Sequence, residues 1–185
     1  MFKQKLLNFL NTKQHYNNRV SLQIVNSIEQ PILDYQKYVV TNTDLPNSFQ
    51  VWYSSQILHL WMVLFPLNPD PHLTKNLIDL VFVETEDRLA RMDVPQQKLM
   101  KSLWEQCIGM TKAYDSGLSA DTNANKDILD GNLKNAITRN VLQNRKFPKV
   151  ADASVRYIRS NLIYTMGLTI EDCEGKLTFP VKIGK

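Results

Sequence analysis

The feature that most constrains the fold is a long run without any formal charge, which extends between Asp44 and Asp70. Its central part, "VWYSSQILHLWMVLF" (residues 51–65), contains two tryptophans and a histidine. The run is close to the lower length limit for crossing a bilayer, includes several polar residues, and is followed by prolines at 66, 69 and 71. We therefore expect no transmembrane span. A helix that is apolar on nearly all sides either lies at the centre of a core or exposes one face to a partner.

The histidine in this run, His59, is a candidate for a catalytic or metal-binding residue. Metal ligation needs two or more further ligands, and no histidine or acid stands at helical ligand spacing from His59. General base catalysis needs an orienting acid, and none lies within one helical turn. The two cysteines, Cys107 and Cys173, also lack metal-binding spacing. We expect no catalytic residue, no metal and no cofactor, and a structural His59 hydrogen-bonded to a neighbour such as Ser55.

Hydrophobic residues at helical spacing predict an all-α fold, because no alternating run is strong enough to indicate a sheet. Prolines, glycines and polar runs divide the pattern into helices. The expected ranges are 21–38 (one or two helices, interrupted or restarted at Pro31), 49–65, 72–92, 95–117, 129–145 and 150–166. The tail from Glu174 is expected to be extended or to contain a short strand. A length of 185 residues, 43% of them hydrophobic, suits a single compact multi-helix domain with a short extended C-terminal tail.

The excess positive charge is confined to the first part of the chain. Four of the 22 basic residues and none of the 18 acidic residues precede Glu29, so the remaining chain is formally neutral. A short helix over residues 2–10 would place Phe2, Leu6 and Phe9 on one side with lysines beside them. This composition is typical of a mitochondrial import signal, although such signals usually carry more Arg and Ser. The alternative is a basic first helix of the folded domain.

Four stretches with distinctive residues follow one another along the chain. They are "SFQVWYSSQILHLWM", in which a Trp precedes an LHxWM-like core; "KAYDSGLSAD", a Tyr-Asp-x-Gly loop after the acidic-basic helix "ETEDRLARMDV"; "ITRNVL"; and "VRYIRSNLIY". Together they resemble the ubiquinol–cytochrome c chaperone family over roughly Leu45 to Leu168. Arg139 and Asn140 match the Trp-Arg-Asn helix of that family, whereas Thr138 replaces its Trp.

The resemblance implies a non-enzymatic assembly factor for respiratory complex III. Such proteins hold newly made cytochrome b, act with a small partner protein near the mitochondrial ribosome, and can associate peripherally with the membrane. The resemblance assigns residues 21–185 to the chaperone domain and favours residues 1–20 as an import segment. It implies a location on the matrix side of the mitochondrial inner membrane, although bacterial relatives also exist. The candidate residues for binding the partner or client are Trp52, His59, Trp61, Met62, Tyr114 and Asp115.

A second candidate surface is basic. Between residues 134 and 159, seven basic residues are accompanied by a single acid, Asp152. Such a surface would suit ribosomal RNA, anionic lipid or an acidic partner, and it would equally suit a solvated pair of helices. The candidate docking residues are Arg139, Arg145, Lys146, Lys149, Arg156 and Arg159.

Two other functions remain open at this point. The first is a ribosome-associated or RNA-binding basic helical protein that uses the stretch from Lys134 to Arg159. The second is a small helical enzyme that uses His59 with Tyr114 and Asp115. Salt-sensitive RNA binding would favour the first function, and a bound metal or cofactor would favour the second.

Overall fold

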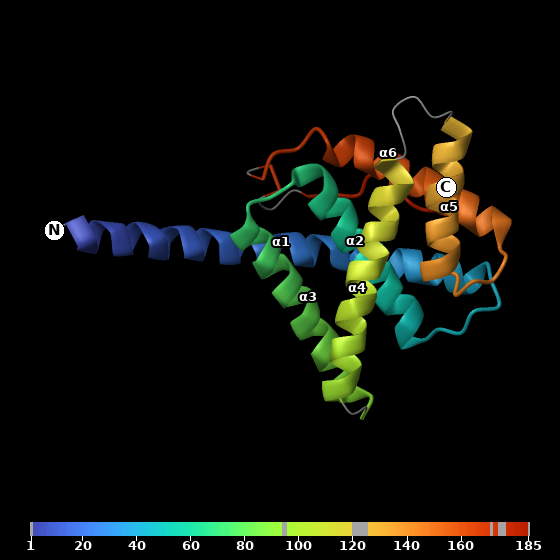
Figure 1. Cartoon of the computed structure of the whole chain (residues 1–185), viewed down its shortest axis with the longest axis horizontal. Coiled ribbons are helices and arrows are strands. Elements are labelled where there is room, and N and C mark those ends of the chain that lie inside the picture. The colour runs from blue at the N-terminus through green and yellow to red at the C-terminus, as the bar shows by residue number, and fades with distance from the viewer. Residues whose placement is uncertain (1, 94–95, 120–125, 171, 174–176, 185) are drawn as a thin grey trace.

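The computed structural model describes residues 2–93, 96–119, 126–170, 172–173 and 177–184, without the side chains of residues 2–13, 96–98, 119 and 126–130. The described residues form six helices and no strand, which confirms the all-α prediction (Figure 1). The helices are α1 (Phe2–Thr41), α2 (Phe49–Leu67), α3 (Pro71–Arg91), α4 (Gln96–Ser119), α5 (Lys126–Asn140) and α6 (Pro148–Thr165). The predicted start of α4 at Pro95 lies outside the described residues.

Helix α2, formed by the charge-free run, is the central element of the fold. It contacts α1, α3, α4 and α6, and every residue from Val51 to Val63 is buried. The hydroxyl oxygen of Ser48 accepts a hydrogen bond from the Val51 amide at its start, and Asn68, in a left-handed conformation (φ 37°), ends it. Of the two alternatives for such a helix, burial at the centre of the core is the one observed.

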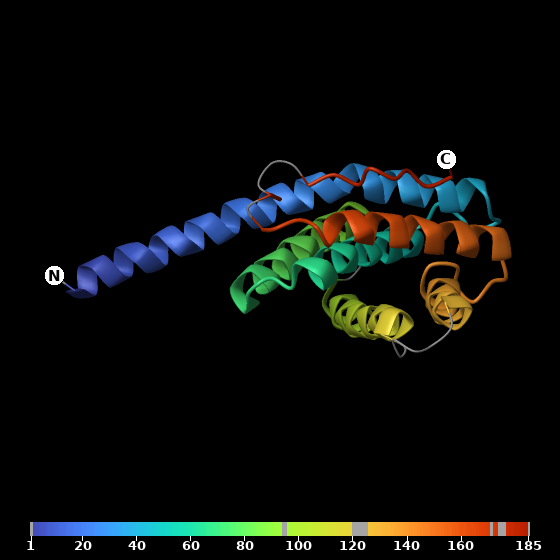
Figure 2. The ribbon, with the colours of Figure 1, turned by 90° about the horizontal axis from the view of Figure 1, so that it is seen from above.

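The other helices surround α2 in layers. Figure 2 shows α1 and the C-terminal tail along one side, α4 and α5 on the opposite side, and α2, α3 and α6 between them. In both views the N-terminal part of α1 projects beyond the remaining helices. The core is therefore one contiguous cluster, built around α2.

Helix α1 is longer than the sequence pattern indicates. It runs unbroken through Pro31, whereas an interruption there and a separate short helix over 2–10 were expected. Proline removes one helical hydrogen bond at a cost of about 3 kcal/mol. Ile28, Ile32 and Tyr35 flank this position and are buried against the core. Their burial, worth about 1.5–3 kcal/mol per large apolar side chain, outweighs the loss.

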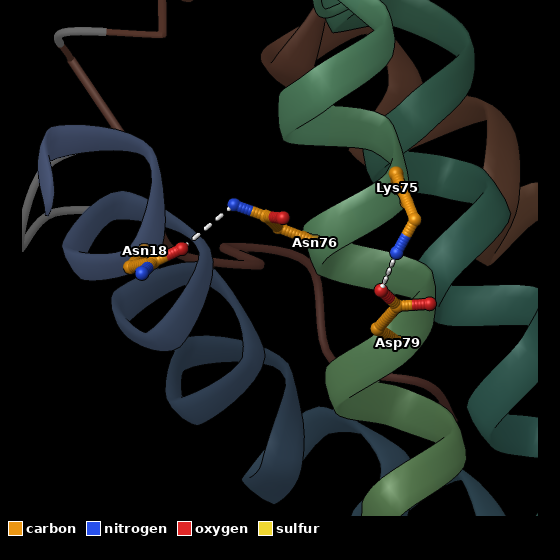
Figure 3. Close-up of polar contacts among 4 residues, drawn as sticks. All are labelled: Asn18, Lys75, Asn76 and Asp79. Carbon is orange, nitrogen blue, oxygen red and sulfur yellow. Dashed lines mark hydrogen bonds and ion pairs between the residues drawn. The ribbon is translucent and has the colours of Figure 1, made fainter. Parts of the chain in front are cut away.

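Packing of α1 against the domain begins before residue 20. Asn17 and Val20 are buried, and the side-chain amide of Asn76 on α3 donates to the Asn18 side-chain oxygen at 2.9 Å (Figure 3). On the same helix α3, Lys75 and Asp79 form an exposed ion pair. The helix passes residue 20 without a break, so the last part of the predicted 1–20 segment contacts the folded domain.

Helices α4 and α5 pack closely at a glycine. Gly117 was expected to end α4, but the helix continues to Ser119. A Cβ atom at Gly117 would lie 3.0 Å from the Leu133 Cα atom on α5, so this residue permits a close approach of two backbones. Helix α5 ends at Asn140, earlier than the expected position near 145, because the chain turns through positive φ at Gln143 and Asn144.

The described part of the C-terminal tail, residues 177–184, lies along α1 and α6 without forming a strand. Leu177 and Phe179 are buried in the core cluster. The side-chain amide of Asn161 on α6 donates to the Val181 carbonyl oxygen at 3.1 Å, and its oxygen accepts from the Val181 amide at 3.3 Å. Asn161 thereby pairs with the extended tail as a neighbouring strand would.

Candidate functional site

The central histidine is enclosed by aromatic residues from three other segments. The rings of Tyr35 on α1, Tyr157 on α6 and Phe179 in the tail lie with their centroids 5.5–5.7 Å from that of His59. His59 Nδ1 donates to the backbone oxygen of Ser55 at 2.7 Å, so its Nε2 atom accepts from the Tyr157 hydroxyl at 2.8 Å. Ser55 was the expected partner, and the hydrogen bond is to its backbone carbonyl group.

The electrostatics of this cluster favour neutral groups. Burial lowers the pKa of His59 from 6.5 to about 4, and the hydrogen bond to Ser55 opposes this shift. Burial also raises the pKa of both the Tyr35 and Tyr157 hydroxyls above the ordinary value. A neutral imidazole with both nitrogens hydrogen-bonded inside a packed core is a structural residue.

Tyr114 and Asp115, the proposed companions of a reactive histidine, lie elsewhere. Trp61 Nε1 donates to Asp115 Oδ1 at 2.8 Å, and the Trp61 ring lies 5.1 Å from the Tyr114 ring. Both residues therefore contact Trp61, whereas the contacts of His59 come from α1, α6 and the tail. The structure does not assemble the three residues of the enzyme hypothesis into one site.

The candidate residues for client or partner binding are mostly internal. Trp52, His59, Trp61, Met62 and Tyr114 are buried, and Asp115 is exposed. Trp52 lies beneath the Arg88 guanidinium, which is 4.2 Å from its ring centroid. Most of these residues lie on α2, which has no exposed face between Val51 and Val63. A client would therefore contact the surface residues that pack over them.

The structure divides the candidate docking residues. Lys149 and Arg156 line one cleft on α6, together with Lys182 of the tail. Arg145 forms an exposed ion pair with Asp44 at 2.9 Å, and Lys146 is exposed beside it. Arg139 is exposed near α4, lining hollows with residues of that helix, and Arg159 is partly buried.

A groove of about 740 Å³ runs between α1 and α3. Its apolar lining includes Leu22, Val83 and Met92, whose exposed fractions are 52%, 53% and 51%. Charged residues complete the lining: Glu29, Glu84, Asp87, Arg88 and Arg91.

Glu84, which lines the groove, is hydrogen-bonded to α2. Glu84 Oε2 accepts from the Gln56 side-chain amide at 2.9 Å, and Gln56 also accepts from the Thr85 hydroxyl at 3.1 Å. Partial burial raises the pKa of Glu84, and the nearby charge of Glu29 adds to this effect. A groove with exposed aliphatic side chains and a charged rim suits an apolar peptide segment with polar flanks.

Sequence reasoning did not single out this groove or Lys182. Leu22 and Val83 lie on faces opposite to those of the buried residues of their helices, and single exposed apolar residues are ordinary on surfaces. The available signal was that α1 and α3 each carry an apolar residue on an otherwise polar face. Only the packing of the two helices brings these residues together.

No helix in the described part of the chain is long and apolar enough to cross a membrane. Among the same residues, no group of three or more His, Cys, Asp or Glu side chains could hold a metal ion.

Comparison with known proteins identifies related sequences and a related fold. The sequence profile of a family described as "Ubiquinol-cytochrome C chaperone" matches residues 41–168. "Protein CBP3, mitochondrial" of Saccharomyces cerevisiae is 27% identical over 164 residues, which cover 82% of this chain and 47% of that protein. The chain thus spans about half the length of this curated relative. The crystal structure of the Cbp3 homolog from Brucella abortus has the same fold, with a TM-score of 0.72 at 20% identity, covering 94% of this chain and 95% of that one.

The family match includes α2 to α6 entirely and contains the four motifs noted in the sequence. Residues of these motifs join α2 to neighbouring helices: His59 is hydrogen-bonded to Tyr157 on α6, and Trp61 to Asp115 on α4. The family is one of chaperones and not of enzymes, which confirms the prediction of a non-enzymatic protein. By this match over most of its length, the chain belongs to the ubiquinol-cytochrome c chaperone family.

Proposed function

We propose that this protein is an assembly factor for respiratory complex III and that it holds newly made cytochrome b until the subunit matures. The observation that carries this proposal is the family match over residues 41–168, together with a yeast relative named as mitochondrial. The protein acts by binding rather than by turnover. Its location is the matrix side of the mitochondrial inner membrane, where it works with a small assembly partner.

The groove between α1 and α3 is the surface at which the client binds. An unassembled membrane subunit exposes apolar helices with charged ends, and the groove offers Leu22, Val83 and Met92 with charged residues at its rim. Trp52 and Gln56 act from beneath, because they hold Arg88 and Glu84 in place on α3. Of the buried residues predicted to contact the client, Trp52 acts in this way, through the surface that it supports.

The basic residues dock the protein to an anionic surface, that of the mitochondrial ribosome or of the membrane. Lys146, Lys149 and Arg156 are exposed, and clustered positive charge raises association rates with anionic surfaces. Arg139 and Arg145 extend the charged surface over the α5–α6 end of the molecule, and Arg159 supports it from a partly buried position. Electrostatic docking of this kind weakens as salt concentration rises.

Site-specific photo-crosslinking tests the proposal. A photoreactive amino acid at Val83, in the groove, should crosslink to newly synthesised cytochrome b in translating mitochondria. The matched control is the same substitution at Ile108, an apolar residue on α4 that is 39% exposed and lies outside the groove. Crosslinks to cytochrome b from Ile108 but not Val83 would contradict the groove as client site. Absence of cytochrome b from every position on the surface would contradict the client itself.

A further inference from the structure

A cleft of about 610 Å³ lies between α6, the end of α1 and the C-terminal tail. Three cations line it: Lys149 and Arg156 from α6 and Lys182 from the tail. The carboxylate in the cleft, Asp152, is engaged in an ion pair with Lys134, and no described carboxylate forms an ion pair with the three cations. The hydroxyls of Tyr38 and Ser160 add neutral donors to the lining. The charge of this cleft is therefore complementary to an anionic group.

The cationic face of α6 continues into an apolar one. Lys149, Arg156, Ser160 and Ile163 follow one another at spacings of seven, four and three residues, so they share one side of the helix. Ile163 is 75% exposed, and Tyr164 and Met166 beside it are 38% and 59% exposed. Transfer of an exposed isoleucine side chain from water into an apolar environment lowers the free energy.

Asp172, in the turn that follows α6, forms hydrogen bonds within that turn. Asp172 accepts hydrogen bonds at its Oδ2 atom from the Thr169 amide and hydroxyl, each at 2.8 Å, which caps the turn locally. In Figure 2 the tail and α6 lie side by side. The cleft and the apolar end of α6 thus form one elongated surface.

We propose that this surface, the α6–tail face, binds anionic phospholipid at a membrane. Lys149, Arg156 and Lys182 contact headgroup phosphates, while Ile163 and Met166 enter the boundary between headgroups and acyl chains. A helix face with cations and exposed apolar side chains is typical of proteins that lie on anionic membranes. RNA offers the same phosphate chemistry but has no apolar layer for Ile163. The proposal deepens the proposed function, since it orients the chaperone against the membrane into which its client inserts.

Flotation of the purified full-length chain with vesicles tests this inference. One vesicle type contains phosphatidylcholine alone, and the other contains phosphatidylcholine with phosphatidylglycerol. The chain should float with the anionic vesicles, less so as salt is raised, and remain unbound with neutral vesicles. The double variant Lys149→Glu/Arg156→Glu should bind the anionic vesicles more weakly than wild type, by a factor of about ten or more. The variant Ile163→Ser should also bind more weakly, although its charge is unchanged.

Matched control variants use exposed residues on another helix. Lys101→Glu/Lys112→Glu reverses two exposed cations on α4, and Ile108→Ser removes an exposed aliphatic side chain of the same helix. Both should bind vesicles nearly as wild type does, and all variants should melt at similar temperatures. Equal losses in the α4 controls, or wild-type binding by Ile163→Ser, would overturn the specific face. Binding of a double-stranded RNA, but not of anionic vesicles, that is lost in the Lys149/Arg156 variant would assign the cleft to RNA instead.

The client experiment separates this inference from the function on which it rests. Crosslinking of cytochrome b at Val83 depends on the groove between α1 and α3. This groove shares no lining residue with the cleft of the α6–tail face. If the vesicle result fails while the crosslink forms, the lipid surface is wrong and the proposed function stands. If vesicles bind through the α6–tail face and no crosslink forms, the lipid surface stands and the proposed function is wrong.

Discussion

Three polar side chains of α2 each form a hydrogen bond with a different neighbouring helix. His59 accepts from Tyr157 on α6, Gln56 donates to Glu84 on α3, and Trp61 donates to Asp115 on α4. Buried polar groups cost free energy unless they are paired, so each of these bonds can form only when its helix docks in the correct register. The polar residues of an apolar helix thereby specify how the helices around it are arranged.

Substitution of His59 tests this structural role. His59→Gln should fold and retain most function, because glutamine can replace one of the two hydrogen bonds. His59→Leu leaves the Tyr157 hydroxyl without its acceptor and should lower the free energy of unfolding by about 1–3 kcal/mol. Urea denaturation at neutral pH measures the free energy of unfolding of both variants. A well-folded His59→Gln protein without any activity would show that the imidazole is reactive.

The same variant reveals the pH dependence that His59 imposes. Its pKa is about 4 in the folded chain and near 6.5 when exposed, so the unfolded chain takes up the proton at higher pH. The wild type should therefore lose free energy of unfolding as pH falls from about 6.5 to 4, by up to about 1.4 kcal/mol per pH unit from this residue. His59→Gln should lack this part of the loss in parallel urea titrations. Identical pH profiles would mean that folding does not lower the pKa of His59.

The helices show where local sequence signals and packing disagree. Pro31 and Gly117 are local signals for a break and an end, yet both lie inside continuous helices. At Pro31 the buried neighbours favour continuation, and at Gly117 the missing side chain permits contact with α5. The number and order of the later helices could be predicted from periodicity, because each buries one stripe. The burial of all sides of α2 could not, since an apolar pattern does not distinguish a core from an interface.

Two glycines of α4 provide a matched test of the α4–α5 contact. Gly117→Ala places a methyl group against the Leu133 backbone and should destabilise the protein by about 1 kcal/mol or more, despite the better helix propensity of alanine. Gly109, in the same helix, has no atom within 4 Å of its added Cβ. Gly109→Ala should therefore stabilise by about 0.5–1 kcal/mol. Thermal or urea unfolding of both variants measures the difference, and stabilisation by both would contradict the close approach.

On the scale of the whole molecule, the projecting part of α1 is distinct from the domain. The charge pattern predicted a boundary at residue 20, but Asn17 and Val20 are buried against the body. Sequence composition could not show which helical turns of the basic segment pack against the domain, because charge does not depend on packing. The import role of the segment stays a prediction.

Two deletions separate targeting from folding. Removal of residues 1–13 should leave the melting temperature nearly unchanged, since the N-terminal part of α1 projects beyond the remaining helices, and should abolish mitochondrial localisation. Removal of residues 1–20 should lower the melting temperature as well, because Val20 and the Asn18–Asn76 hydrogen bond are lost. Thermal melts and cell fractionation measure these outcomes. Normal localisation of the shorter deletion would show that the segment is not an import signal.

Reversal of the charges at the α5–α6 connection tests docking. In the triple variant Arg145→Glu/Lys146→Glu/Lys149→Glu, stability should change by no more than about 1 kcal/mol, because these side chains are exposed and surface ion pairs contribute little. Association with mitochondrial ribosomes, membranes or the partner should weaken, most clearly at low ionic strength. Co-sedimentation across a salt series measures the effect. Wild-type association would identify these residues as an ordinary solvated surface.

The central claim is that the protein binds newly made cytochrome b through the groove between α1 and α3. The most direct measurement is co-purification with pulse-labelled mitochondrial translation products, comparing wild type with Val83→Asp/Met92→Asp and with the exposed-surface control Ile108→Asp. We predict that labelled cytochrome b is enriched with wild type and with the control, and is lost with the groove variant although it remains folded. Equal recovery with all three proteins, or no enrichment of cytochrome b with wild type, would contradict the claim.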